Sequence, residues 1–181
     1  MFTTQESAIT GCFEITPKKF FDNRGGFVKV YHSSLFSDLG IKDNFVEEYY
    51  SKSHKNVIRG MHFQLPPHEH AKIVYCISGS ALDVVMDLRK NSDTFGKVVT
   101  FEINEKNANM IYIPKGLAHG FCVLSDSATL VYKTSTVYNE KCDHGILWSS
   151  IDFSWPSSNP IISERDSKLT PYKEFTSPFI L

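Results

Sequence analysis

The sequence has no long hydrophobic run and no excess of charge of one sign. No apolar run approaches the roughly 18 residues of a membrane-spanning helix. The first ten residues lack a basic segment followed by an apolar one, so we expect neither a membrane span nor a signal peptide. The formal net charge is -1, which argues against electrostatic binding to nucleic acid or to an anionic membrane. We therefore expect a cytoplasmic protein whose partner is a small molecule.

Paired cysteines and linker segments are also missing. The four cysteines form no C-x-x-C pair, which indicates neither a zinc knuckle nor a redox motif, so we expect reduced, partly buried thiols. The sequence has no internal repeat, low-complexity segment or Pro/Gly-rich linker. Since 41% of the 181 residues are hydrophobic, the chain can bury a sizeable core, and we expect residues 1–181 to form one domain.

What the sequence does have is a series of short segments rich in Val, Ile, Phe and Tyr, each bounded by Gly, Pro, Asn, Asp or Ser. This is the pattern of β-strands. The segments are residues 27–32, 44–50, 72–77, 81–88, 97–103, 108–113, 120–124 and 128–135. Their number and spacing predict an all-β sandwich or barrel. Helical turns are expected only at residues 34–39 and 164–168, the second because Ser163 is a suitable N-cap.

Residues 57–74, V-I-R-G-M-H-F-Q-L-P-P-H-E-H-A-K-I-V, bring cations and histidines together. Arg59 and Lys72 provide an anion-binding field, and His62 has the side chain whose ordinary pKa lies nearest physiological pH. A lone histidine on an apolar strand is more often a core residue, but the position of His62 between the two cations favours a functional role. This segment therefore predicts a site that holds a negatively charged ligand and moves its protons.

Two Gly-bounded histidine segments, residues 60–79 and 114–121, resemble the two motifs of the cupin superfamily. Cupins are jelly-roll barrels (double-stranded β-helices) with a site inside the barrel mouth, and the metal-binding members use His, His, Glu and a last His. Here His68, His70 and His119 match the histidines, but Tyr75 and Cys76 stand where the carboxylate is expected. We therefore expect no metal and an exposed loop at His68 and His70, while a metal-dependent cupin stays an alternative.

Eight short motifs follow one another along residues 20 to 170. They are F-D-N-R-G (21–25), I-R-G-M-H-F-Q (58–64), A-K-I-V (71–74), D-V-V-M-D-L-R (83–89), P-K-G-L-A-H-G-F (114–121), Y-K-T with Tyr138 (132–138), W-P (155–156) and I-S-E-R-D (162–166). In this order they resemble the dTDP-4-dehydrorhamnose 3,5-epimerase family. The resemblance implies an all-β cupin jelly roll with an N-terminal arm and short C-terminal helices. It also implies a cofactor-free isomerase that epimerises a nucleoside-diphosphate 4-keto-6-deoxy-hexose at C3, C5 or both, for surface polysaccharide biosynthesis.

The resemblance assigns the catalytic roles. His62 is expected to remove the proton on the carbon next to the ketone, and Asp166 to hold its imidazole. Lys72 is expected to stabilise the enolate oxygen, and Tyr132 to return a proton from the opposite face of the sugar. Without the motifs, Tyr132 could equally be a strand aromatic and Asp166 part of a solvated surface pair.

The substrate-binding residues and the oligomeric state are likewise implied by the resemblance. The expected contacts are Arg24, Lys29, Glu47, Tyr49, Arg59, Asp83, His119, Tyr138, Asp143 and Arg165. Arginine presents a rigid fork of donors to a diphosphate, and the ring of Tyr138 is expected to stack on the nucleotide base. A homodimer is expected in which the segment of Arg24 reaches into the neighbour's site, and an N-terminal arm rich in Phe is compatible with strand exchange.

The sequence departs from the family pattern at a few nucleotide-contacting positions. Lys29 stands where Glu is usual, and Glu47-Glu48-Tyr49 replaces Gln-Asp-Asn. These changes reverse hydrogen-bonding polarity, which gives the hypothesis that the base is not thymine or is held differently. A single-centre epimerase, a keto-isomerase and a non-catalytic sugar-nucleotide binder therefore remain alternatives to the 3,5-epimerase.

Overall fold

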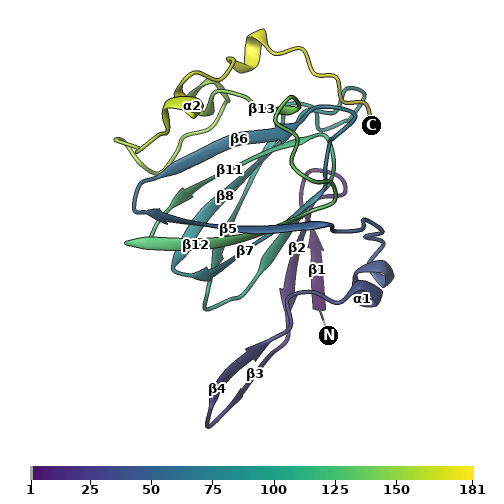
Figure 1. The fold of residues 1–181 in the computed structure, drawn as a ribbon, viewed down its shortest axis with the longest axis vertical. Helices are drawn as coiled ribbons and strands as arrows, with labels where there is room; N and C mark the ends of the chain where they lie inside the picture. The colour runs from purple at the N-terminus through teal and green to yellow at the C-terminus, as the bar shows by residue number, and fades with distance from the viewer. Residues whose placement is uncertain (1) are drawn as a thin grey trace.

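Two antiparallel β-sheets face each other in the computed structural model, which describes residues 2–181. The six-stranded sheet has the order β1 (Phe2–Glu6), β2 (Phe13–Pro17), β10 (Met110–Ile113), β7 (Lys72–Ser78), β12 (Ser127–Thr134) and β5 (Glu47–His54). The five-stranded sheet has the order β13 (Asp143–Gly145), β6 (Ile58–Gln64), β11 (Leu117–Val123), β8 (Ser80–Asp87) and β9 (Val98–Asn104). Together they form the walls of the expected jelly-roll barrel (Figure 1).

The remaining elements lie around this barrel. A separate hairpin of β3 (Lys19–Asp22) and β4 (Gly25–Val28) projects away from it at the bottom of Figure 1. The helices are short, namely α1 (Ser33–Asp38), α2 (Glu164–Ser167) and the 3-10 turns Trp148–Ser150 and Tyr172–Glu174. No helix among residues 2–181 is both long enough and apolar enough to cross a membrane.

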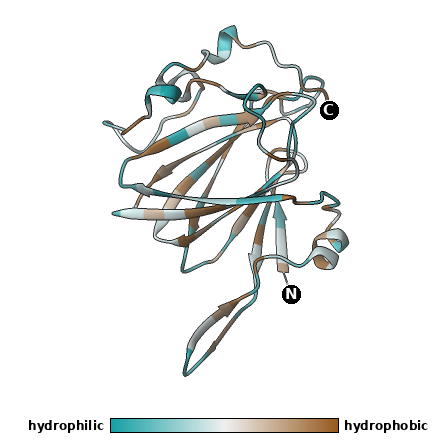
Figure 2. Cartoon of the chain, in the orientation of Figure 1, coloured by the Kyte–Doolittle hydropathy of each residue, from teal (hydrophilic) through white to brown (hydrophobic). Residues whose placement is uncertain are grey.

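The central strands are buried on both faces, which explains why their sequences are continuous apolar runs and do not alternate with polar residues. In β7, Val74 and Cys76 pack into the core between the sheets, whereas Ile73 and Tyr75 pack into a cluster outside the six-stranded sheet. Phe36 of α1 belongs to that outer cluster. Figure 2 accordingly shows hydrophobic colour along much of the central strands.

The C-terminal segment closes the outer face of the five-stranded sheet. Ile151 and Phe179 pack there against Val84 and Met86 of β8. The barrel is thus covered on both sides, and because successive side chains of a strand point to opposite faces, one set of them lies in the interior. It is this interior set that carries the polar residues of the site.

Strands β6 and β11 approach each other unusually closely at two glycines. Gly60 has a φ of +135°, and a Cβ there would lie 2.5 Å from the Cα of Gly120. A Cβ at Gly120 would lie 2.8 Å from the carbonyl oxygen of Arg59. Neither position accepts a side chain unless the strands move apart. The two glycines therefore set the distance between the strands that carry His62 and His119, which are direct partners in the register.

Most predicted elements are confirmed, with differences at the N-terminus and at β6. The predicted helical turns correspond to α1 and α2, and Ser163 Oγ accepts a hydrogen bond from Asp166 N at 3.1 Å as the predicted N-cap. The strand predicted at residues 27–32 is wrong beyond Val28, because the chain leaves the β3–β4 ladder there. Strands β1, β2, β3, β6 and β13 were not predicted. All four cysteines are free, three of them buried.

Candidate active site

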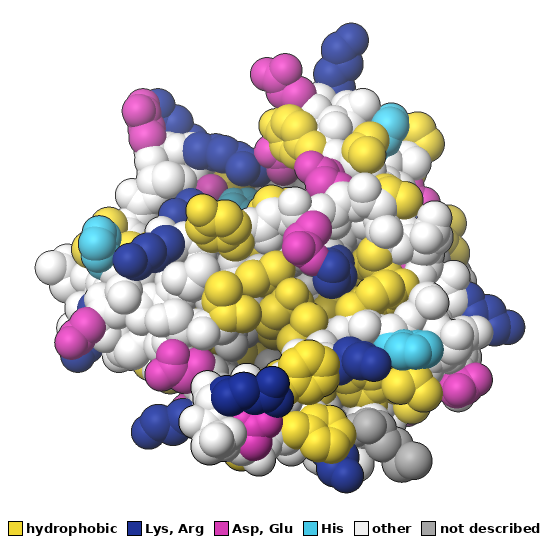
Figure 3. All heavy atoms as spheres, turned by 60° about the horizontal axis from the view of Figure 1, so that its bottom comes forward, with side chains coloured by type: hydrophobic (Ala, Val, Ile, Leu, Met, Phe, Trp, Pro, Cys, Tyr) yellow, Lys and Arg dark blue, Asp and Glu magenta, His cyan; other side chains and the backbone are white. Residues whose placement is uncertain are grey.

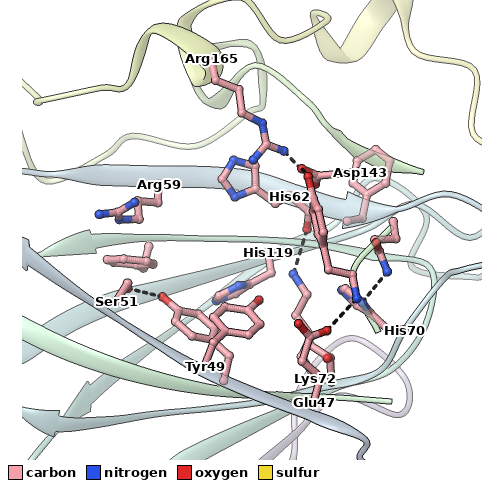
Figure 4. A pocket seen from close by; sticks show the side chains of 16 residues that line it. Glu47, Tyr49, Ser51, Arg59, His62, His70, Lys72, His119, Asp143 and Arg165 are labelled. Carbon is pink, nitrogen blue, oxygen red and sulfur yellow. Dashed lines mark hydrogen bonds and ion pairs between the residues drawn. The ribbon is translucent and has the colours of Figure 1, made fainter. Parts of the chain in front are cut away.

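A cavity of about 430 Å³ opens between the two sheets, and polar side chains from both sheets line it. The five-stranded sheet contributes His62 and His119, and the six-stranded sheet contributes Tyr49, Lys72 and Tyr132. In Figure 4, His62 lies on the upper wall and Tyr49 and Lys72 on the lower one. The structure therefore brings the predicted base, cation and phenol to one cavity.

His62 is held by a carboxylate that comes from the far end of the chain. Its Nε2 lies 2.7 Å from Oδ1 of Asp166, which is buried in α2 beside Ser163. The second carboxylate oxygen accepts a hydrogen bond from Gly60 N at 3.2 Å. With Nε2–H donating to Asp166, the neutral imidazole has its lone pair on Nδ1. Nδ1 is therefore the atom that can accept a proton.

Burial and charge keep this pair in the form that a general base needs. Burial lowers the pKa of His62 below its ordinary 6.5, and the hydrogen bond and charge of Asp166 oppose that effect only partly. For Asp166, burial alone would raise the pKa, but the hydrogen bonds from His62 and Gly60 outweigh it and hold the pKa below its usual value. The imidazole is thus neutral and the carboxylate ionised near neutral pH.

Lys72 is a buried cation with few polar contacts. It is 6% exposed, and its Nζ donates one long hydrogen bond, of 3.3 Å, to the carbonyl oxygen of His62. Burial lowers its pKa to about 8, and the negative charges of Asp143 and Asp83 offset part of this fall. No carboxylate among residues 2–181 forms an ion pair with it. An ammonium in this position can stabilise a developing negative charge in the cavity.

Tyr132 presents its hydroxyl from the wall opposite His62. The hydroxyl lies 2.9 Å from Ser51 Oγ, and the ring stacks on Tyr49 with centroids 4.8 Å apart and an interplanar angle of 16°. The ring of His119 is T-shaped to the same ring, with centroids 6.2 Å apart. Burial raises the pKa of Tyr132, so the phenol keeps its proton and can donate it. Neither Ser51 nor this stacking was predicted from the sequence.

A second Asp–His pair lies next to the first. His119 Nε2 lies 2.8 Å from Oδ2 of Asp83, and both side chains are buried. Asp83 lies behind His119 and does not line the cavity. Arg59 lies further along β6, where its Nε donates to Ser53 Oγ at 3.0 Å and its guanidinium is exposed. This end of the cavity thus carries an exposed guanidinium that pairs with no carboxylate in the part of the chain that the structure describes, as the predicted phosphate contact requires.

The other end of the cavity is formed by charged residues around an exposed aromatic ring. Tyr138 is 59% exposed, and its backbone N donates to Oε2 of Glu47 at 2.7 Å. Arg165 pairs with Asp143 at 2.8 Å, and the hydroxyl of Tyr138 lies 3.4 Å from the same carboxylate. All four residues line the cavity. An exposed ring edged by carboxylates and one guanidinium can receive a nucleotide base.

Besides Asp83, two predicted binding residues lie outside the cavity of their own chain. Arg24 is in the turn of the β3–β4 hairpin, where its side chain is 86% exposed and pairs with Asp22 at 2.6 Å. Lys29 is exposed just after this hairpin. Their roles stay predictions, and they would require the hairpin to reach another molecule.

The prediction of an exposed loop at His68 and His70 is wrong. Both side chains are partly buried because the loop folds back over the cavity mouth, where Gln64 Nε2 donates to the carbonyl oxygen of His68 at 2.9 Å. His70 lines the cavity, and its Nδ1 lies 3.1 Å from Gln64 Nε2. Burial, followed by the nearby charge of Lys72, lowers the pKa of His70 to about 2, so its ring is neutral.

Two of the histidines that match cupin metal ligands have ring nitrogens bound to other side chains. Nδ1 of His70 accepts from Gln64, and Nε2 of His119 is bound to Asp83. Within residues 2–181, no three His, Cys, Asp or Glu side chains gather closely enough to hold a metal ion.

Comparison with known proteins agrees with this geometry. The chain matches the family described as dTDP-4-dehydrorhamnose 3,5-epimerase over residues 6–174. The dTDP-4-dehydrorhamnose 3,5-epimerase of Shigella flexneri is 46% identical over 153 residues, which are 83% of this chain and 84% of the relative. A dTDP-4-dehydrorhamnose 3-epimerase of Streptomyces niveus is 37% identical over 161 residues, which are 87% of this chain and 78% of the relative.

A solved structure extends the similarity to the whole chain. The dTDP-6-deoxy-D-glucose-3,5-epimerase of Legionella pneumophila, solved in complex with dTDP-4-keto-L-rhamnose, has a TM-score of 0.95 and 30% sequence identity to this chain. The match covers 100% of both chains. With the family match over most of the chain and the jelly-roll barrel, this shows that the protein belongs to the dTDP-4-dehydrorhamnose 3,5-epimerase family of isomerases.

Proposed function

We propose that this protein inverts C3, C5 or both in a nucleoside-diphosphate 4-keto-6-deoxy-hexose, without a cofactor, and so supplies a deoxysugar for surface polysaccharide. The observation that carries the proposal is one cavity that holds a carboxylate-oriented imidazole, a lone ammonium and a neutral phenol. A proton next to a ketone is weakly acidic, so its removal needs a base and a cation at the enolate oxygen. Inversion then needs a separate proton donor.

The residues divide these steps among them. Nδ1 of His62 takes the proton from carbon, the C–H electron pair forms the enolate double bond, and the C4 oxygen becomes an oxyanion beside Lys72. The Tyr132 hydroxyl then protonates the same carbon, the enolate returns to the ketone, and exchange with water resets both residues. C3 and C5 both flank the C4 ketone, so one ammonium serves either centre. That β6 and β12 belong to different sheets supports delivery and removal from opposite sides.

The two ends of the cavity support binding of the nucleotide part. Arg59 offers an exposed guanidinium to a diphosphate, and Tyr138 offers an exposed ring to a base. Glu47 and Tyr49, where the sequence departs from its family, both line the cavity. Their position supports the hypothesis that the base is not thymine or is held differently.

Deuterium incorporation tests the function and counts the inverted centres. In heavy water with dTDP-4-keto-6-deoxy-glucose and related donors, we expect the protein to exchange sugar carbon protons, since each turnover takes a proton from solvent. Two exchanged positions, read by NMR, indicate a 3,5-epimerase, and one indicates a single-centre enzyme such as the Streptomyces niveus relative. No exchange with any donor, or exchange that a chelator abolishes, would contradict the proposal.

We also propose a homodimer in which Arg24 completes the neighbour's site. The hairpin supports this because it projects from the barrel and exposes Phe20, Phe21 and Phe27 at 48%, 75% and 60%. Hydrophobic side chains also gather on the face that lies at the bottom of Figure 1 (Figure 3). Exposed apolar groups of this kind are typical of interfaces.

Mixing two inactive variants tests the exchange of Arg24 between subunits. Arg24→Ala and His62→Asn proteins are expected to be impaired alone but to regain activity when unfolded and refolded together. Random pairing gives half heterodimers with one intact site each, so about a quarter of the wild-type activity is expected. Complementation is scored by deuterium exchange, with dimer content from light scattering. A monomer, or no recovery in a refolded mixture of dimers, would contradict the shared site.

A further inference from the structure

Gln64 is a buried amide that ends one of the sequence motifs but has no role in the proposed chemistry. It is the last residue of β6, two positions after His62, and is 3% exposed. Its cross-strand partner is Asp143, where the chain enters β13. Residues 135–142 connect β12 to β13, so they pass from one sheet to the other at the end of the cavity that Tyr138 lines.

The amide of Gln64 contacts the backbone on both sides of Tyr138. Its Oε1 accepts a hydrogen bond from Asn139 N at 2.6 Å, and its Nε2 donates to the carbonyl oxygen of Val137 at 3.3 Å. The N–H of Asn139 can only donate, which fixes the orientation of the amide. The same Nε2 also lies 2.9 Å from the carbonyl oxygen of His68 and 3.1 Å from Nδ1 of His70, so its two hydrogens are shared among these acceptors and the carbonyl oxygen of Val137. One side chain thus joins β6, the loop of His68 and the segment that carries Tyr138.

Two further contacts complete the attachment of this segment. Glu47 Oε2 accepts from Tyr138 N at 2.7 Å, and Thr136 Oγ1 donates to the carbonyl oxygen of His68 at 2.9 Å. Contacts at each residue from Thr136 to Asn139 therefore hold this segment, while the ring of Tyr138 remains 59% exposed. Because the backbone that carries the ring is held in place and the ring itself is exposed, Tyr138 forms a stacking surface before any ligand binds. Such a surface avoids the cost of ordering a loop when the ligand binds.

We propose that Gln64 is a positioning residue for nucleotide binding, which acts through Tyr138 by fixing the backbone on both sides of that ring. This inference rests on the proposed function, in which the ring receives the base. It assigns Gln64 no contact with the reacting carbon. His62 keeps its own supports, Asp166 and the pairing of β6 with β11, when Gln64 is changed.

The test compares Gln64→Leu with wild type and with Gln5→Leu, the same change at an exposed position of β1. Calorimetry with dTDP, UDP, GDP and CDP first finds the diphosphate that wild type binds best, and this is the probe. In Gln64→Leu, the Kd for the probe is expected to rise about tenfold, because buried hydrogen bonds are lost under the ring. Deuterium exchange at saturating substrate should stay within about twofold of wild type, since binding and not the transition state is affected.

A double-mutant cycle with Tyr138→Ala shows whether the effect passes through the ring. If it does, Gln64→Leu costs little further affinity when the ring is already absent. Amide hydrogen exchange should also show that Tyr138 and Asn139 lose protection in Gln64→Leu. An equal loss of affinity with and without the ring, or an equal fall in turnover and affinity, would overturn the inference. Failure of all four diphosphates to bind wild type would contradict the proposed function itself, and with it the role of the ring.

Discussion

Replacing His62 by asparagine is expected to abolish proton exchange at the sugar carbons. Asparagine keeps a polar group that can still contact Asp166 but has no basic nitrogen, so the carbon proton has no acceptor. General-base catalysis contributes on the order of a hundredfold to ten-thousandfold, and we expect a loss at the upper end of that range because the proton is so weakly acidic. The measurement is the rate of deuterium incorporation by NMR.

Two controls separate loss of the base from loss of the fold. Nucleotide affinity should change by less than about twofold, because the imidazole serves the reacting carbon and not the diphosphate. His54→Asn, the same change at an exposed position at the end of β5, should behave as wild type. Exchange that persists in His62→Asn within tenfold of wild type would show that another group is the base.

Replacing Lys72 by methionine is expected to lower turnover by about a hundredfold to a thousandfold, the range for removing one group that stabilises an oxyanion. Methionine fills a similar volume but carries no charge. Ground-state affinity should fall much less, because the negative charge on the C4 oxygen develops only in the transition state. Lys52→Met, at an exposed position of β5, is the matched control.

The pH dependence gives this prediction a second, independent readout. The ammonium form of Lys72 is the active one and its pKa is about 8, so kcat/KM of wild type should fall as the pH rises through about 8. The neutral form of His62 is the active one, and its pKa lies below 6.5, so kcat/KM should fall again at acid pH below that value. Lys72→Met should lose the alkaline limb and keep the acid one. An alkaline limb that survives in this variant would assign it to a different group.

The sequence predicted the barrel well where burial determines composition. The strands buried on both faces, such as β7 with the run I-V-Y-C-I and β8 with the run V-V-M, contain continuous apolar stretches and were found. Strand β6 was missed because its interior positions are the polar residues of the site and Gly60 breaks the run. The pattern that marks a strand is therefore weakest in the strand that carries the base. Strand β1 was missed because it lies at the sheet edge, with largely exposed polar residues.

The motifs predicted the catalytic residues of the cavity but not the roles of the residues around them. His62, Lys72 and Tyr132 were predicted and share one cavity, because a motif match fixes both residue type and position in the fold. Gln64 was part of a motif but received no role, since an amide at a strand end has no chemical signature without its three-dimensional contacts. The burial of His70 was missed for the same reason. Nothing in the order of residues shows that the loop folds back over the cavity.

The contact between His62 and Asp166 joins residues 104 positions apart, which has a consequence for the order in which the protein is made. Synthesis runs from the N-terminus, and domains fold as their residues emerge. Both sheets are available to the nascent chain once β13 has emerged, well before α2. Until then the imidazole lacks the carboxylate that sets its tautomer. The reactive pair can therefore form only after the residues of both walls have been synthesised.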